Sequence, residues 1–555
     1  MKSLVSVVMP SIVALAAATI ALPLAAQTPP SPSAAVAGPA APPKLIVVIS
    51  VDQFSADLFA EYRSHFTGGF ARLLGGTVFP SGYQSHAATE TCPGHSTILT
   101  GFRPEHTGII ANTWVDQKAP RTDKTVYCAE DESVPGSTSS SYTVSAKHLL
   151  VPTLGERMKL ANPANRTVSV AGKDRAAVMM GGHRVDELWW WNGKAFVSYA
   201  GRTTPAVVDR ANAAVAARVA QPQSALDEPD WCASHDKAIP LSADKSVGTG
   251  RFEREAGNAT KFRASPSFDA AILSLAAGMV QDMKLGHGPA TDIISIGASA
   301  TDYIGHTYGT EGSEMCIQVA NLDQSLDSFF AVLDQTGADY EVVLTADHGG
   351  NDLPEREREN ALPEAQRADV ALAPALMGKA IAAKLGIAGP VLFGDIPNGD
   401  VWLSTALTPK QRNAAQAEAI ARYKAMPQVA AVFTAARIMA SPEPKGPPEN
   451  WTLLEKARAS FNPAHSGDLL VFLKPRVTPI PDPTKGYVAT HGSPYDYDRR
   501  VPILFWRKGM TAAEHAGSIQ TVDIMPTLAA QIGLPILAPK IDGRCIDLAS
   551  GAPCS

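Results

Sequence analysis

KLIVVISV, residues 44–51, is a continuous run of apolar and β-branched residues. Runs of this kind are typical of strands buried on both faces of a parallel sheet. Four further stretches are similar: TVSVA at 167–171, DIISIG at 292–297, YEVVLT at 340–345 and VPILF at 501–505. Alanine-rich stretches with helical periodicity lie between several of them, such as 267–283 and 315–333. This alternation predicts an α/β fold, with a mostly parallel central sheet flanked by helices.

Polar residues follow the predicted strands. Ligand sites in parallel sheets gather beyond the carboxyl ends of the strands. The residues found there are Asp52 after the first run, Lys173 and Arg175 after the second, Asp302 after the third, and Asp347 with His348 after the fourth. We therefore expect these side chains to share one site.

Two pairs among the polar residues have the spacing of metal ligands. Asp347 and His348 are adjacent, and the two glycines after them let the backbone bend so that both side chains can reach one ion. Asp302 and His306 are four residues apart and share one face of a helical turn. Each pair alone also fits a simpler description, as an ordinary turn or as a polar pair on a helix.

The combination carries more weight than each part. His491 lies in a glycine-containing loop, and Asp52 alone could be a capping or turn residue. Added to the two pairs, they bring the set to three aspartates and three histidines. Such mixed oxygen and nitrogen ligands suit zinc, and the number of ligands suffices for two Zn²⁺ ions, although manganese or iron could occupy the same ligands.

TETCPGHST, residues 89–97, contains the candidate nucleophile. The hydroxyl of Thr91 precedes Cys-Pro-Gly at the mouth of a predicted helix, where backbone N–H groups and the helix dipole favour phosphate. A threonine hydroxyl bound to zinc can act as an alkoxide nucleophile. As a bare motif, the stretch could equally be a helix cap.

Length and composition bound the class of protein. A chain of 555 residues predicts one large domain with insertions, or two to three units. With 45% hydrophobic and 18% charged residues, the composition is that of an ordinary soluble protein. The formal net charge is −6 and no long Lys/Arg run is present, so we expect no nucleic-acid-binding surface.

The N-terminus has the layout of a secretory signal peptide. Lys2 precedes an apolar stretch that ends in small residues, which predicts a signal peptide over 1–26. A retained anchor is the alternative, but Pro10 and Pro23 would interrupt a spanning helix. Residues 27–43, rich in Pro and Ala, are expected to be a tether. We therefore predict a periplasmic or secreted protein that is not in the membrane after cleavage.

Two stretches fit the sheet pattern poorly. We predict core segments at 44–180, 267–350 and 486–555, with cap insertions over the site at 181–266 and 351–485. The tryptophans Trp189, Trp190 and Trp191 in the first insertion could line a substrate entrance, but a buried packing cluster is favoured.

Six cysteines fit an oxidising compartment. None forms a CxxC pair, so a thiolate metal site is not expected. Six cysteines allow 15 connectivities. We expect a disulfide between Cys545 and Cys554, which close a short loop, and suggest the pairs Cys92 with Cys128 and Cys232 with Cys316.

The motifs, taken in order, resemble those of the alkaline phosphatase superfamily. They are VDQ at 51–53, T-x-PGH at 91–95, HTGIIAN at 106–112, D-x₃-H at 302–306, ADHG at 346–349 and THG at 490–492, with a similar tail at 522–527 and 541–543. Within the superfamily, the chain resembles the threonine-nucleophile branch shared by nucleotide pyrophosphatase/phosphodiesterases and a group of bacterial alkaline phosphatases.

The resemblance implies a role for each motif residue. It implies one zinc held by Asp302, His306 and His491, and another held by Asp52, Asp347, His348 and Thr91. Thr91, rather than Thr89, would be the nucleophile, and Asn112 would donate a hydrogen bond to a phosphoryl oxygen. His95 and His106 belong to the motifs but not to the implied metal ligands, and we expect them to be structural.

Lys173 and Arg175 indicate the subclass. They alternate along the chain, so on an extended segment both point to one side. Two cations suit the charged oxygens of a phosphate monoester dianion, and the segment resembles the Lys-x-Arg clamp of the monoester-preferring bacterial enzymes. An exposed basic turn is the alternative interpretation.

The sequence therefore predicts an alkaline phosphatase that hydrolyses small phosphate monoesters through a phosphothreonine at a site with two Zn²⁺ ions. A phosphodiesterase or nucleotide pyrophosphatase would keep the metal ligands without using Lys173 and Arg175. A sulfatase normally carries a modified Cys or Ser in a C/S-x-P-x-R pattern. It is disfavoured here because Cys92 is followed by Pro93, Gly94 and His95, which do not fit that pattern. A catalytically silent phosphate-binding protein is the alternative from another class.

Overall fold

The computed structural model describes residues 41–395, 398–536, 540–548 and 554. The predicted signal peptide, 1–26, lies outside these residues, as does the predicted tether, 27–43, up to residue 40. Within the described ranges, no helix has both the length and the apolar character needed to cross a membrane.

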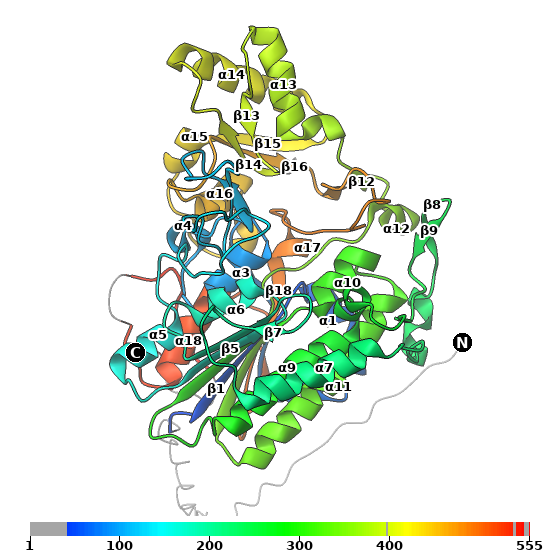
Figure 1. Cartoon of the computed structure of the whole chain (residues 1–555), viewed down its shortest axis with the longest axis vertical. Coiled ribbons are helices and arrows are strands. Elements are labelled where there is room, and N and C mark those ends of the chain that lie inside the picture. Colours follow the sequence, from blue (N-terminus) through cyan, green and yellow to red (C-terminus); the bar gives the residue numbers. More distant parts are fainter. Residues whose placement is uncertain (1–40, 396–397, 537–539, 549–553, 555) are drawn as a thin grey trace, which may run out of the picture. The chain divides into compact units, whose positions relative to one another are not determined.

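A nine-stranded sheet forms the centre of the fold (Figure 1). In spatial order its strands are β19 (Ala513–Glu514), β2 (Thr77–Tyr83), β18 (Arg500–Arg507), β11 (Tyr340–Thr345), β1 (Leu45–Val51), β10 (Asp292–Ala298), β5 (Thr167–Ala171), β6 (Glu187–Trp191) and β7 (Phe196–Val197). The strands from β11 to β6 are parallel, whereas β18 and β7 run antiparallel to their neighbours. All the apolar runs quoted above are strands of this sheet, and the predicted mostly parallel α/β fold is confirmed.

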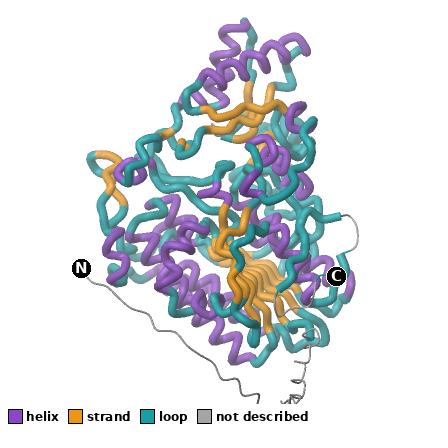
Figure 2. The backbone as a smooth tube through the Cα atoms, turned by 180° about the vertical axis from the view of Figure 1, so that it is seen from behind, coloured by secondary structure: helices purple, strands orange, loops and turns teal. Residues whose placement is uncertain are grey.

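The side chains of β1 alternate between two hydrophobic clusters, as the pleat of a strand requires. Val47 and Ile49 pack with residues of α9 (Pro266–Asp282) and α11 (Ser313–Thr336). Ile46 and Val48 pack on the other face, with residues of α18 (Ile524–Gln531). Helices therefore lie on both faces of the sheet, which is why β1 is apolar along its whole length (Figure 2). The other helices of this part that we use below are α3 (Thr91–Ile98), α6 (Asp174–Gly181), α7 (Ala206–Ala220) and α10 (Ala300–Tyr308).

The segment 181–266 differs from our expectation of a cap over the site. Its first part, β6, is a parallel strand of the central sheet, and α7 adds Val208 and Val215 to the same hydrophobic cluster as α9. Trp189 and Trp191 enter one cluster and Trp190 the other, and all three are at most 6% exposed. The tryptophans are packing residues. A strand that is apolar on both faces shows no period-2 pattern, which explains why the sequence did not reveal it.

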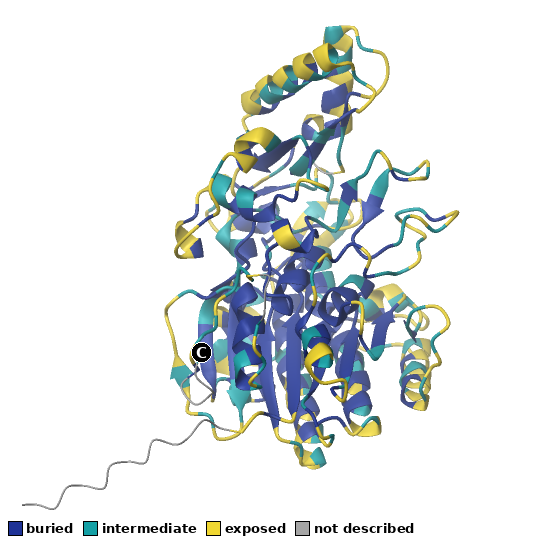
Figure 3. Ribbon diagram, turned by 90° about the vertical axis from the view of Figure 1, so that its left-hand side faces the viewer, coloured by how far each residue is buried: buried dark blue, intermediate teal, exposed yellow. Residues whose placement is uncertain are grey.

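Residues 351–485 contain a second sheet with its own core. Its strands are β13 (Leu392–Phe393), β14 (Gly399–Leu403), β16 (Leu469–Leu473) and β15 (Val429–Thr434), all paired antiparallel. Helices α13 (Pro374–Leu385) and α14 (Pro409–Ala425) pack on it through a separate hydrophobic cluster. In Figure 3 this part is at the top, with buried strands beneath helices that expose their outer faces. We call residues 351–485 the cap.

Three disulfides join the cysteines in the suggested pairs. They are Cys92–Cys128, Cys232–Cys316 and Cys545–Cys554. The first joins α3 to the residue that follows β4 (Thr125–Tyr127), directly beside Thr91. These pairings are confirmed.

Candidate active site

Three neighbouring parallel strands bring the predicted aspartates together. Asp52 follows β1, Asp347 follows β11, and Asp302 lies in the first turn of α10, which follows β10. Because β11, β1 and β10 are adjacent and parallel, their carboxyl ends meet at one edge of the sheet. All three aspartates are at most 1% exposed. The structure therefore brings the three aspartates together at the edge where the sequence placed them.

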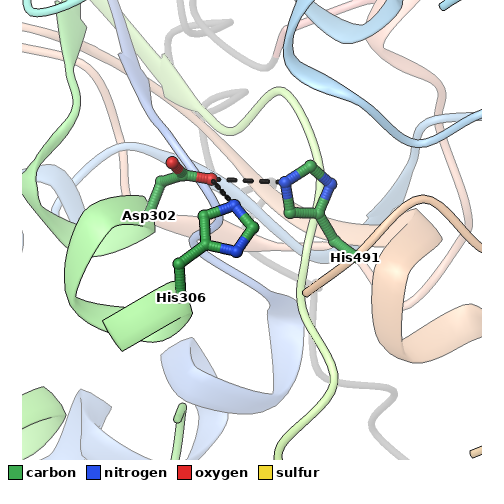
Figure 4. A group of neighbouring side chains, drawn as sticks. All are labelled: Asp302, His306 and His491. Atoms are coloured by element: carbon green, nitrogen blue, oxygen red, sulfur yellow. Dashed lines mark ion pairs between the residues drawn. The ribbon is translucent and has the colours of Figure 1, made fainter. Parts of the chain in front are cut away.

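Asp302, His306 and His491 form the first cluster (Figure 4). Oδ1 of Asp302 lies 3.4 Å from Nε2 of His306 and 3.3 Å from Nε2 of His491. Both imidazole rings are held in orientation by backbone carbonyl groups. Nδ1 of His306 is 2.8 Å from the carbonyl oxygen of Ala489, and Nδ1 of His491 is 2.8 Å from that of Thr89. Backbone contacts of this kind leave Nε2 directed at the cluster, as in metal-binding histidines.

Asp52, Asp347 and His348 form the second cluster, together with His95. Nε2 of His348 lies 3.2 Å from Oδ2 of Asp347, and its Nδ1 contacts the carbonyl oxygen of Gly349 at 2.8 Å. Nε2 of His95 is 3.3 Å from Oδ1 of Asp52, and its Nδ1 is 3.2 Å from Oδ2 of Asp347. Asp52, His95 and Asp347 lie close enough to one another to hold one ion. The two clusters adjoin, since the rings of His348 and His491 stack with centroids 3.6 Å apart.

His95 has closer contacts to the site than we expected from the sequence. It stands four residues after Thr91 on α3, so one turn of helix separates the two side chains. Its ring is fully buried between two carboxylates. Burial alone would lower its pKa, but Asp347 and Asp52 together raise that pKa to about 10. The i,i+4 spacing from Thr91 was the signal that could have placed it in the site.

The donor set fits divalent metal ions. Among the described residues, Oδ1 of Asp302, Oδ2 of Asp347 and Nε2 of His348 are buried and make no hydrogen bond. Such buried atoms need a partner, and a cation between the carboxylates would provide one. The ligand types, carboxylate and imidazole, are those of zinc and similar ions. Burial, followed by the charge of His348, lowers the pKa of His491 to about 3, so this imidazole is neutral and can act as a ligand.

Lys173 lies between the two clusters. Its Nζ is 2.5 Å from Oδ2 of Asp302 and 3.0 Å from Oδ2 of Asp52, and its side chain is 1% exposed. Burial lowers the pKa of this amine, but Asp302 and Asp52 outweigh that effect and keep the pKa above its ordinary value. Its ammonium group is therefore charged. In the fold, Lys173 is the residue before α6.

Arg175 and Thr91 approach each other from two helices. Thr91 is the first residue of α3 and is fully buried, and Nη2 of Arg175, on α6, lies 3.5 Å from its Oγ1. Nη1 of Arg175 is 3.4 Å from the hydroxyl of Tyr127. Lys173 and Arg175 thus reach the same site, but Lys173 contacts carboxylates whereas Arg175 faces the hydroxyl.

Asn112 is held with its amide oxygen turned toward the backbone. Oδ1 accepts a hydrogen bond from the N–H of Cys92 at 2.8 Å, and the backbone N–H of Asn112 donates to Oε2 of Glu90 at 2.7 Å. Because Oδ1 is engaged, Nδ2 is the end of the amide that can donate to a ligand.

The start of α3 lies against the end of β11. A Cβ built on Gly94 would lie 2.0 Å from the carbonyl oxygen of Asp347, which no larger residue could accommodate without a shift of the backbone. The glycine therefore permits the approach of the helix that carries Thr91 to the strand end that carries Asp347.

A cavity of about 370 Å³ opens from the site toward the cap. On the site side it is lined by Asn112, Arg175, Asp302, His306 and His491, and on the cap side by residues that include Asp395, Asp400, Trp402, Leu470 and Phe472. No residue of 181–266 is among those that line it. Of the two predicted insertions, 351–485 therefore lines this cavity and 181–266 does not.

A chain with this sheet, this threonine-bearing helix and these two Asp/His clusters belongs to the alkaline phosphatase superfamily, as its family model and curated relatives show. Residues 46–494 match the model of the type I phosphodiesterase/nucleotide pyrophosphatase family, and the chain belongs to this family. The resemblance noted in the sequence is confirmed.

Two curated relatives match almost the whole chain. Alkaline phosphatase PhoK of Sphingomonas sp. is 58% identical over 517 residues, which cover 92% of this chain and 92% of PhoK. Alkaline phosphatase PhoD of Zymomonas mobilis subsp. mobilis is 47% identical over 510 residues, 91% of this chain and 88% of PhoD. Among solved structures, alkaline phosphatase PafA matches with a TM-score of 0.77 at 23% identity, covering 89% of this chain and 97% of PafA. This last likeness concerns the fold.

Proposed function

We propose that this chain is an alkaline phosphatase that hydrolyses small phosphate monoesters through a phosphothreonine formed on Thr91. The observation that carries the proposal is the position of Thr91: it begins α3, its hydroxyl lies beside the guanidinium of Arg175, and His95, one turn further along the helix, contacts Asp52 and Asp347. A helix N-terminus and an arginine both attract the phosphoryl group. The names of the relatives PhoK and PhoD support the same activity.

The two clusters would hold two divalent ions, which we expect to be Zn²⁺. Asp302, His306 and His491 would hold one. The resemblance assigns Asp52, Asp347, His348 and Thr91 to the other; of these, Asp52 and Asp347 are close enough to share an ion, and His348 contacts Asp347. When bound, the ions supply Lewis-acid stabilisation of the attacking and leaving oxygens. The buried atoms that make no hydrogen bond are the observation in favour of ions at these places.

The residues of the chain then act as follows. Oγ1 of Thr91 bonds to phosphorus as the bond between phosphorus and the alcohol oxygen breaks, and the alcohol leaves. Water next bonds to phosphorus as the bond to Thr91 breaks, and phosphate is released. Arg175, Lys173 and Nδ2 of Asn112 hold the remaining phosphoryl oxygens, the electrostatic part of the catalysis.

Lys173 and Arg175 favour a monoesterase over a diesterase. A monoester dianion presents one more negative charge than a diester, and these two cations, of which Lys173 is buried and Arg175 partly exposed, can balance it. A solved variant of PafA carries substitutions of one threonine, one asparagine, one lysine and one arginine. These are the four residue types that we assign to Thr91, Asn112, Lys173 and Arg175.

We also infer a periplasmic or secreted location. Three disulfides form within the described residues, and disulfides persist in oxidising compartments. The layout of residues 1–26, which precede the described part, is that of a signal peptide.

The proposal is tested by comparing kcat/KM for an aryl phosphate monoester and the matching diester at mildly alkaline pH, on zinc-loaded protein. In Arg175→Ala we expect the monoester value to fall about a hundredfold and the diester value to change little, because only the dianion uses the second cation. Lys173→Ala/Arg175→Ala should lose more. Bound zinc is measured in each variant, because Lys173 also contacts Asp52 and Asp302.

Arg210→Ala, an exposed arginine on α7, serves as the matched control and should keep wild-type rates. A wild-type preference for the diester that Arg175→Ala leaves unchanged would move the protein to the phosphodiesterase branch. Bound zinc without turnover of either ester would point to a phosphate-binding protein.

A further inference from the structure

The cap side of the cavity is acidic. Asp395 and Asp400 belong to the cap, and Glu90 is the residue before α3. All three line the same cavity. They are also near enough to interact electrostatically, since the charge of Asp395 acts on Glu90 and the charge of Glu90 acts on Asp400. The organic part of a substrate, which extends from the phosphoryl group toward the cap, would meet these carboxylates.

Asp400 is placed in the cavity wall by its strand. It belongs to β14, and its Oδ1 accepts a hydrogen bond from the N–H of Gly467 at 2.6 Å. Burial, followed by the charge of Glu90, raises its pKa to about 7. At mildly alkaline pH, above that value, Asp400 carries a negative charge.

No lysine or arginine balances these carboxylates from the described lining of the cavity, apart from Arg175. Arg175 lies beside Thr91, and its charge also acts on Glu90, the residue before Thr91, whereas Asp395 and Asp400 belong to the cap. The cap therefore contributes two carboxylates and no cation to the described lining, whereas Arg175 reaches the phosphoryl position at Thr91.

Aromatic side chains lie among the carboxylates. Trp402 and Phe472 line the cavity from the cap, and Tyr487 lies at its edge, where it is 41% exposed. The ring of Tyr487 stacks on that of His306, with centroids 4.4 Å apart, so its position is fixed relative to the site. Aromatic faces and carboxylates together are the surroundings in which proteins bind quaternary and primary ammonium groups.

We propose that this cavity selects phosphate monoesters whose alcohol part carries a positive charge, such as amino alcohols and choline-like alcohols, and disfavours those whose alcohol part carries a carboxylate. The inference rests on the proposed phosphatase activity and names the substrate class of that same site. Asp395 and Asp400 are the residues that determine the selectivity.

The experiment measures kcat/KM for three esters: phosphocholine, its neutral analogue dimethylbutyl phosphate in which carbon replaces nitrogen, and phosphoglycolate. Each ratio between two esters is then compared between the wild type and Asp395→Asn/Asp400→Asn. The comparison of ratios cancels the intrinsic reactivity of each leaving group. Asparagine keeps an oxygen that can accept the hydrogen bond from Gly467. Asp395→Asn alone, at an exposed residue, provides a second variant should the double one fold poorly.

In the double variant, we expect the kcat/KM ratio of phosphocholine to dimethylbutyl phosphate to fall about tenfold. The ratio of phosphoglycolate to dimethylbutyl phosphate should rise by a similar factor. Both values follow from the Coulomb energy of unit charges across a partly solvated cavity. Asp244→Asn, an exposed aspartate between β8 (Ile239–Ser242) and β9 (Lys245–Val247), removes the same charge elsewhere and should leave both ratios unchanged.

Turnover of all three esters with ratios that neither aspartate variant alters would overturn the selectivity while leaving the phosphatase intact. If none of the three esters, nor an aryl phosphate, is hydrolysed by zinc-loaded wild type, the proposed function fails and this inference fails with it.

Discussion

Strand β11 has a buried carboxylate near each end, and the two are in opposite electrostatic situations. Glu341, its second residue, is 1% exposed, and its Oε1 makes no hydrogen bond within the described chain. Asp347, just beyond the last residue, is fully buried between His348 and His95. Burial raises the pKa of Glu341 to about 7, with only a partial opposing effect of Arg507. At Asp347 burial acts in the same direction, but the two histidines hold the pKa well below its ordinary value.

The difference shows that histidine partners keep a buried carboxylate ionised at the carboxyl end of the sheet. A buried carboxylate without partners becomes neutral near pH 7, whereas one with cationic or hydrogen-bonding partners stays ionised. Because a carboxylate must be ionised to bind a metal, the second kind is available as a ligand over a wider range of pH. The same strand thus carries one carboxylate that costs stability and one that is kept charged for use.

The largest expected effect is at the functional end of β11. Asp347→Asn removes the charge that His348 and His95 surround, and kcat/KM for an aryl phosphate should fall about a thousandfold or more. Bound zinc, measured by mass spectrometry, should fall with it. Glu341→Gln, the same change of charge at the other end of the strand, is the matched control and should stay within about twofold of wild type. Equal rates for the two variants would contradict the comparison.

Metal removal should affect stability next. Ions that bind only the folded protein stabilise it by about 4 kcal/mol when their concentration is a thousand times Kd. A chelator should therefore lower the Tm of the wild type by several degrees, and added zinc should restore it. The shift should be smaller in Asp347→Asn, which loses one cluster, and unchanged in Glu341→Gln. A Tm that the chelator leaves unchanged would show that the clusters hold no ion.

The smallest effect is the dependence of stability on pH at Glu341. Its pKa is raised on folding from 4.5 to about 7, so its contribution to stability is fully present below pH 4.5 and is lost as the pH rises through 7. Glu341→Gln should therefore raise the free energy of unfolding at pH 8 by at most about 3 kcal/mol, and change it little near pH 4. Thermal unfolding of both proteins at the two pH values measures this, and a variant that is less stable at pH 8 would refute it.

The sequence predicted the sheet and most of the site because the relevant information is local. Asp52, Asp302 and Asp347 each follow a recognisable apolar strand, and parallel strands bring their carboxyl ends together. His491 is different, since it lies in a loop after the cap and was assigned by its motif.

What the sequence could not supply depends on contacts between distant segments. Trp189, Trp190 and Trp191 lie on a strand buried on both faces, so they show no alternation. Asp400 and Phe472 face the cavity only because the cap folds back over the site, and no motif marks them. The place of Lys173 between Asp52 and Asp302, rather than beside Arg175 at Thr91, likewise required the side-chain positions.

The position of β18 in the sheet has a consequence for how the protein folds. β18 fills the gap between β2 and β11, yet it is made from residues 500–507. While the chain is being synthesised or exported from its N-terminus, β2 and β11 expose unpaired edges until these late residues arrive. Open strand edges are sites of aggregation, so the protein should depend on chaperones until its C-terminal part is available, and truncation before residue 500 should yield insoluble chains.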